Sequence, residues 1–242
     1  MAGEAFERQE TGFVDAINET FVQLGSIFTV SGTGGNARLT NVNGARKLEG
    51  RLPNGSEPYT DVIISRRGGN DFRISMKGPS APSIAGGGLE GLEEIVPTLS
   101  GNFLDAALKY YLQEDYKEGD LIPDVYGQVG DNLKRTIVRG TRALGGPIDF
   151  LYIVPMNVTA TMQGNTLKFN GRLVPANSFA DRNDIYLRLR KRRADQPFVP
   201  TQKDKRGLPA ILGRSPSRGD TGRRIVTVTT PPSNATIVSF DS

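Results

Sequence analysis

The chain of 242 residues contains no histidine, no cysteine and no tryptophan. Without histidine there is no imidazole base to activate a serine or a thiol, and no imidazole metal ligand. Without cysteine there is no disulfide framework, no thiolate zinc site and no iron–sulfur cluster. Any metal would therefore be bound by carboxylate and carbonyl oxygens, which suit Mg²⁺, Mn²⁺ or Ca²⁺.

Long hydrophobic runs are also missing. No stretch approaches the ~18 apolar residues that a transmembrane helix needs, so we expect no membrane contact. The segment Met1–Arg8 lacks the basic and apolar regions of a secretion signal, so we expect no export by a signal peptide. The length predicts one large domain, or one domain with an extension.

The net charge of +4 is unevenly distributed. Basic residues concentrate between Asp181 and Arg224, whereas the rest of the chain is mildly acidic. Such a segment indicates contact with DNA, with another polyanion or with an acidic protein surface, and arginine-rich segments also join subunits into oligomers. The candidate contact residues are Arg188, Arg190, Lys191, Arg192, Arg193, Lys205, Arg206, Arg214 and Arg218.

Hydrophobic periodicity divides the first 155 residues into helices and strands. Apolar residues at helical spacing predict an amphipathic helix over Ala5–Leu24. Next we expect a short strand over Ser26–Val30 and a glycine-rich turn over Ser31–Gly35. A polar stretch without clear periodicity then extends to Pro58. Two strands, Tyr59–Ser65 and Asp71–Lys77, form a predicted hairpin. Further helices are predicted at Leu89–Val96, Asn102–Tyr116 and Asp131–Leu144, and an apolar strand at Ile148–Val154.

The remainder of the chain has a β pattern. Asn157–Gln163 and Thr166–Leu173 predict a hairpin around Gly164-Asn165, and strands are predicted at Ile185–Arg190 and Arg224–Thr230. The intervening Gln196–Gly222 is rich in proline, glycine and arginine and is expected to be extended. We therefore predict an α/β (α+β) fold with two regions, residues 1–155 as a core and residues 156–242 as a β-rich, basic C-terminal extension or arm.

The predicted 59–77 hairpin carries the clearest candidate chemistry. Asp61 stands at the start of its first strand and Lys77 at the end of its second, so both side chains come to one end of the hairpin. This arrangement resembles the PD-(D/E)xK nuclease superfamily, whose fold is restriction-endonuclease-like. The predicted order of elements over Glu4–Pro155, with helix, strand, hairpin, helix and strand, is similar to that fold, a mixed sheet flanked by helices.

The resemblance implies a site that binds Mg²⁺ or Mn²⁺ through Asp61 and a helical glutamate, either Glu10 or Glu7. Lys77 would stabilise charge on the scissile phosphate. The family has an acidic residue two positions before this lysine, where the present chain has Ser75. Glu90, Glu93 or Glu94, after the glycine-rich loop Gly78–Gly88, could substitute for that carboxylate. The loop itself could hold phosphates through its backbone N–H groups.

Two functions follow from these patterns. The first is a divalent-metal-dependent DNA endonuclease, or a derivative with weakened catalysis. The second is a non-enzymatic virion protein of a neck, connector, tail or baseplate, whose C-terminal arm joins other virion proteins in an oligomer. The many glycines, short strands and the Arg/Pro-rich segment look like those of proteins encoded by tailed bacteriophages, which implies a location in the host cytoplasm or in the virion.

Overall fold

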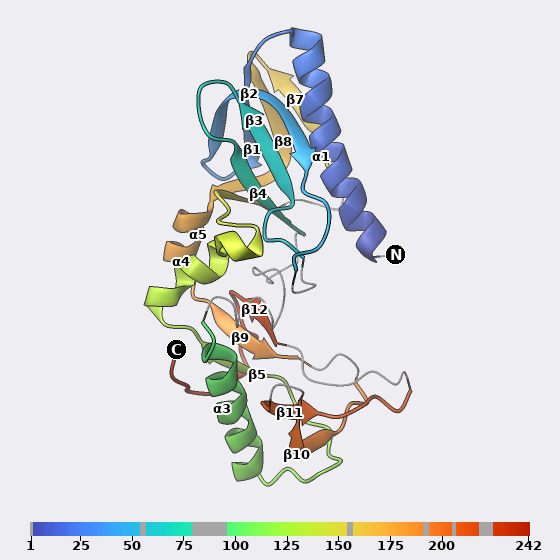
Figure 1. Cartoon of the computed structure of the whole chain (residues 1–242), viewed down its shortest axis with the longest axis vertical. Helices are drawn as coiled ribbons and strands as arrows, with labels where there is room; N and C mark the ends of the chain where they lie inside the picture. Colours follow the sequence, from blue (N-terminus) through green and yellow to red (C-terminus); the bar gives the residue numbers. More distant parts are fainter. Residues whose placement is uncertain are drawn as a thin grey trace. The chain divides into compact units, whose positions relative to one another are not determined.

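The computed structural model describes residues 2–53, 57–78, 96–153, 157–190, 194–204, 207–217 and 225–242, with side chains from Glu7 onward. The chain forms two compact units (Figure 1). The first comprises Met1–Ala81 and Val138–Arg182, and the second comprises Pro82–Ile137 and Asn183–Ser242. The division differs from the expected boundary at residue 155, because segments distant in the sequence combine in each unit.

The first unit is built on a large mixed sheet. Its strands are β1 (Phe28–Gly34), β2 (Arg38–Lys47), β3 (Val62–Arg66), β4 (Phe72–Lys77), β6 (Phe150–Ile153), β7 (Ala160–Gln163) and β8 (Thr166–Pro175). They are ordered β1-β2-β3-β4-β6-β8-β7, and β1 also pairs with β8, so six strands form a closed ring. The pairs β4–β6 and β1–β8 are parallel, and the other pairs are antiparallel. The two hairpins predicted from the sequence, β3–β4 and β7–β8, are both present.

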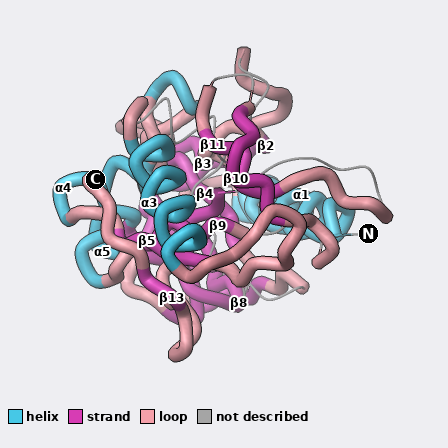
Figure 2. Tube along the Cα trace, turned by 90° about the horizontal axis from the view of Figure 1, so that it is seen from below, coloured by secondary structure: helices cyan, strands magenta, loops and turns pink. Residues whose placement is uncertain are grey.

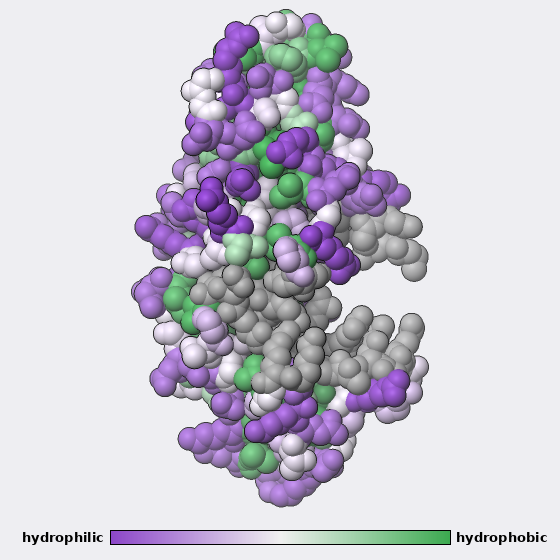
Figure 3. All heavy atoms as spheres, in the orientation of Figure 1, coloured by the Kyte–Doolittle hydropathy of each residue, from purple (hydrophilic) through white to green (hydrophobic). Residues whose placement is uncertain are grey.

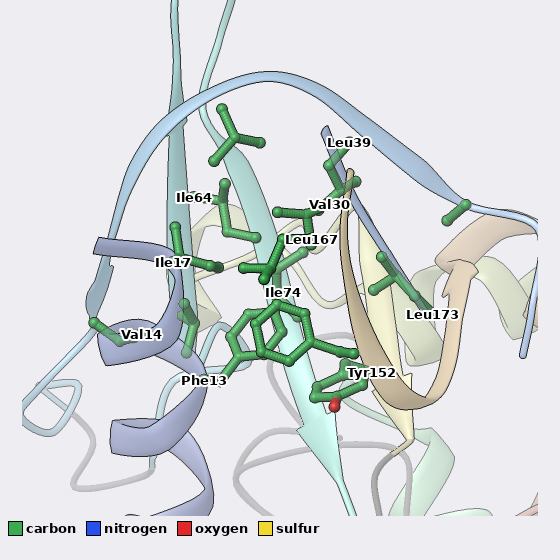
Figure 4. Packing of buried hydrophobic residues seen from close by; sticks show 14 of the residues in the cluster. Phe13, Val14, Ile17, Val30, Leu39, Ile64, Ile74, Tyr152, Leu167 and Leu173 are labelled. Atoms are coloured by element: carbon green, nitrogen blue, oxygen red, sulfur yellow. The ribbon is translucent and has the colours of Figure 1, made fainter. Parts of the chain in front are cut away.

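The helix α1 (Ala2–Leu24) packs its apolar face against this sheet (Figure 1). Phe13 is 1% exposed, and its ring centroid lies 4.8 Å from that of Tyr152 and 4.4 Å from that of Phe169. Ile17, one turn further along, is fully buried in the same cluster (Figure 4). At this end of the core Asn18 donates to the backbone oxygen of Ala45 and accepts from its N–H, which joins α1 to β2. The predicted amphipathic helix is confirmed, and its burial fixes the position of Glu10.

The ten-residue strand β2 was not expected, because the sequence there has no regular alternation. The pairing of β2 with β1 shifts register between Leu39, which lies opposite Val30, and Val42, which lies opposite Phe28, and Asn41 has a φ of 60°. A bulge of this kind inserts an extra residue, so Leu39 and Val42 are both buried although two residues lie between them. The strand β1 likewise continues to Gly34, so the turn is shifted to residues 35–37. At Gly35 a Cβ would lie 2.1 Å from the oxygen of Leu173.

The second unit contains a four-stranded sheet, a hairpin and the helix α3 (Leu99–Gln113). The sheet order is β12-β9-β5-β13, from Ile225–Val228, Tyr186–Leu189, Val125–Gln128 and Thr236–Ile237. In Figure 2 the helix α3 lies beside the C-terminal segment, where the Phe103 and Phe240 rings are 5.4 Å apart. The strands expected at 185–190 and 224–230 are thus confirmed over most of their length.

Part of the proline-rich segment 196–222 is folded rather than extended away from the protein. Its strands β10 (Phe198–Lys203) and β11 (Pro209–Leu212) form an antiparallel hairpin. Phe198 and Ile211 are fully buried, and the Phe198 ring lies 5.5 Å from that of Tyr111 on α3. Because these apolar side chains are buried, the hairpin is part of the core of the second unit.

The remaining helices are short. The helix α4 (Asp131–Arg139) ends just before Gly140 and is followed by a 3₁₀ turn at Arg142–Leu144, and α5 (Ala176–Arg182) follows β8. The α+β class is confirmed. The sequence placed a helix between the 59–77 hairpin and β6, and this helix, α3, belongs to the second unit. The helix expected at 89–96 falls almost entirely outside the described residues.

No helix in the described ranges is long and apolar enough to cross a membrane. On the face drawn in Figure 3, hydrophobic side chains are scattered among hydrophilic ones.

Candidate active site

Asp61 lies immediately before β3, held between two neighbouring strands. Its backbone N–H donates to Ile74 O of β4, and its backbone oxygen accepts from Leu48 N, each at 2.9 Å. The register pairs Val62 with Ile74, which places Asp61 opposite Ser75 across the hairpin. The hairpin thus brings Asp61 and the end of β4 together, as the sequence predicted.

The side chain of Asp61 is oriented by two donors from β4. Ser75 Oγ donates to Asp61 Oδ2 at 3.0 Å, and Met76 N donates to the same oxygen at 2.6 Å. Ser75 is 1% exposed. Ser75 is therefore a hydrogen-bond donor to the aspartate, and not a second anionic group.

Removal of this donor should weaken the fold in a pH-dependent way. We expect Ser75→Ala to lower the free energy of unfolding by about 1.5–3 kcal/mol near neutral pH, because a hydrogen bond to a charged, buried acceptor is lost. The Ser75 hydrogen bond lowers the pKa of Asp61, so the loss should shrink as the pH falls and Asp61 becomes protonated in both proteins. Urea unfolding at several pH values measures this, with Ser65→Ala on the adjacent strand as control. A loss that does not vary with pH would contradict the role given to Ser75.

Lys77 ends β4, two residues after Ser75, and faces the same carboxylate. Burial raises the pKa of Asp61 above its ordinary value, and the positive charge of Lys77 is the largest influence that lowers it. The negative charge of Glu57 raises this pKa further. Asp61 is therefore a carboxylate whose ionised form gains from a nearby cation.

Glu10 reaches the same place from α1. Burial raises the pKa of Glu10, and the next cause is the negative charge of Asp61. The side chain of Glu10 is 25% exposed, whereas that of Glu7 is 73% exposed. The sequence offered Glu7 and Glu10 as alternatives. Glu10 is thus the one that is partly buried and lies close to Asp61.

Lys47, at the end of β2, is a member of this cluster that sequence reasoning missed. Its Nζ lies 3.4 Å from Glu10 Oε2 and 4.0 Å from Glu7 Oε1. The ion pair lowers the pKa of Glu10, opposing the effect of burial. No sequence signal pointed to Lys47, since it lies in the stretch whose strand pattern is disrupted by the bulge.

These side chains surround a pocket of about 570 Å³ in the first unit. Acidic residues outnumber basic ones in its lining, which comprises Glu7, Glu10, Lys47, Leu48, Glu49, Gly50, Glu57, Pro58, Asp61, Met76 and Lys77. The glycine-rich loop beyond Gly78, together with Glu90, Glu93 and Glu94, lies outside the described residues. Within the described ranges no cluster of three or more His, Cys, Asp or Glu side chains is suited to holding a metal ion.

The predicted basic contact residues that the structure describes belong to the second unit, not to the unit that contains this pocket. Arg188 on β9 donates through Nε to Asp124 Oδ2 at 2.9 Å, and its guanidinium lies 5.6 Å from the Tyr126 ring centroid. Its charge is therefore engaged within the second unit. Arg190 and Arg214 are exposed. Lys191, Arg192, Arg193, Lys205, Arg206 and Arg218 lie outside the described residues.

Comparison of the chain with protein-family models, curated proteins and solved structures finds no match in any of the three.

Proposed function

We propose that the protein is a divalent-metal-dependent DNA endonuclease of the PD-(D/E)xK type, encoded by a tailed bacteriophage. The observation that carries the proposal is the meeting of Glu10, Asp61 and Lys77 at one pocket, although the first two are 51 positions apart in the sequence. A half-buried pair of carboxylates with raised pKa values is costly to ionise, and a bound cation would offset that cost.

The donor set suits Mg²⁺ or Mn²⁺. Asp61 and Glu10 supply anionic oxygens, and Mg²⁺ is commonly bound by one or two carboxylates together with substrate phosphates. The metal would then be held jointly by these two carboxylates and by the DNA. When bound, such an ion lowers the pKa of a water molecule and neutralises charge on the scissile phosphate.

The chain's own residues would prepare this site. Ser75 Oγ and Met76 N donate hydrogen bonds to Oδ2 of Asp61 and so orient the carboxylate, and Oδ1 would be the oxygen that contacts the metal. Lys77 brings an ammonium group with three donors to the same end of the hairpin, where it would contact a phosphate oxygen or orient a water. The long polymer substrate would be contacted by basic residues elsewhere, among which Arg190 and Arg214 are exposed.

The proposal is tested by cleavage of supercoiled and linear DNA with Mn²⁺, comparing the wild type with Lys77→Ala. We expect cutting that EDTA stops and that Lys77→Ala reduces at least about a thousandfold, because charge stabilisation in the transition state is lost. The Lys77→Ala variant should retain the circular dichroism spectrum of the wild type. Equal cutting by both proteins, or none by either under all metal conditions, would count against the nuclease.

Two observations favour a second function, a virion structural protein with an inactive site. Ser75 replaces the acidic ligand, and Glu10 is already neutralised by Lys47. In that case the protein should bind no Mn²⁺, cleave no DNA and form a stable oligomer with itself or with other virion proteins. Analytical ultracentrifugation of the full chain, together with the cleavage assay, separates the two functions.

A further inference from the structure

Lys47 places a positive charge directly beside Glu10. Its Nζ lies 3.4 Å from Glu10 Oε2, and the two side chains are only 21% and 25% exposed. Salt screens such a partly buried pair less than a pair on the open surface. The second contact of Lys47, to Glu7 at 4.0 Å, involves a carboxylate that is largely exposed.

The backbone of Lys47 also lies close to that of Asp61. Lys47 is the last residue of β2 and pairs with Val62, and the following residue, Leu48, donates its N–H to the backbone oxygen of Asp61. Lys77 lines the same pocket, so two lysines lie in the lining beside Glu10 and Asp61.

We propose that Lys47 is an internal counter-ion that competes with a divalent cation for Glu10 and thereby sets the metal affinity of the site. The inference rests on the proposed function, because it concerns the same carboxylates. A divalent ion and an ammonium group repel each other strongly at contact distances in a partly dry pocket. Binding of the ion to Glu10 therefore requires that Lys47 leave its ion pair.

Binding of Mn²⁺ alone, followed by electron paramagnetic resonance and by calorimetry, tests the inference without any DNA or activity. We expect Lys47→Met to bind Mn²⁺ roughly tenfold more tightly than the wild type, since the competing charge is removed. The matched control is Arg46→Met, which removes the same charge from the neighbouring, exposed residue of β2. Adjacent residues of a strand point to opposite faces, so this control should leave Mn²⁺ affinity within about twofold of the wild type.

The outcomes separate this inference from the function on which it rests. Equal or weaker Mn²⁺ binding by Lys47→Met, beside a wild type that binds Mn²⁺, overturns the counter-ion role and leaves the metal site standing. A lower melting temperature of Lys47→Met without tighter binding shows that Lys47 only docks α1, and also overturns it. Absence of Mn²⁺ binding from both proteins removes the proposed metal site and the inference together. Loss of the tighter binding when Glu10→Gln is added to Lys47→Met supports the inference.

Discussion

Asp61→Asn should abolish Mn²⁺-dependent DNA cleavage, with a fall of at least about a thousandfold, and at the same time stabilise the protein. The activity is lost because the substitution removes the carboxylate that we propose as a metal ligand. The geometry survives, since the amide oxygen of the new side chain can accept the same hydrogen bonds from Ser75 Oγ and Met76 N. The cleavage assay and thermal unfolding measure the two effects on one variant.

The sign of the stability effect follows from the raised pKa of Asp61. A carboxyl group whose pKa is higher in the folded state favours folding while it is protonated, and this benefit is lost as the pH rises above the ordinary value of 3.8. The amide that replaces the carboxyl group does not ionise, so the variant's melting temperature should exceed that of the wild type at pH 7–8, by about 2–4 °C per kcal/mol. The difference should disappear toward pH 3.5.

Asp71→Asn is the matched control for Asp61→Asn. Asp71 is exposed and precedes β4 at the far end of the same hairpin. The control should not change cleavage appreciably. If Asp61→Asn cleaved DNA at the wild-type rate, the assignment of Asp61 as the metal ligand would be wrong.

Phe13→Ala should have the largest effect on stability, a loss of about 3–5 kcal/mol. The ring is 1% exposed and lies between those of Tyr152 and Phe169, so its removal leaves a cavity where α1 meets the sheet. Because domains of this kind have about 5–15 kcal/mol in total, the first unit should become marginally stable. Equilibrium unfolding in urea gives the change.

Phe13→Ala should also affect the candidate metal site, because Phe13 and Glu10 lie on the same helix. Glu10 lies one turn before Phe13 on α1, so a loosened helix should also weaken Mn²⁺ binding. Val22→Ala is the control on this helix, because Val22 is 80% exposed, and it should change stability by less than about 0.5 kcal/mol. Similar losses for the two variants would show that α1 is not anchored by Phe13.

Local patterns in the sequence predicted the elements whose signals are strong over short distances. The helical spacing of Phe13 and Ile17 predicted α1, and the alternation in 71–77 predicted β4 and, with it, the approach of Lys77 to Asp61. The strand β2 was missed because its bulge hides the period of two, and Gly35 was read as part of a longer turn. The closed ring could not be predicted, since the β1–β8 pairing joins residues such as Val30 and Leu167, which are far apart in the chain.

The sequence by itself determined which chemistry is available: oxygen ligands and lysines, with no imidazole or thiolate, and an Asp61 and a Lys77 at one end of a hairpin. Only the tertiary structure decided that Glu10 rather than Glu7 faces Asp61, that Lys47 joins them, and that Arg188 is bound by Asp124. The reason is physical. Side-chain chemistry and short-range periodicity are properties of neighbouring residues, whereas an ion pair or a pocket depends on how a helix docks on a sheet closed by long-range pairing.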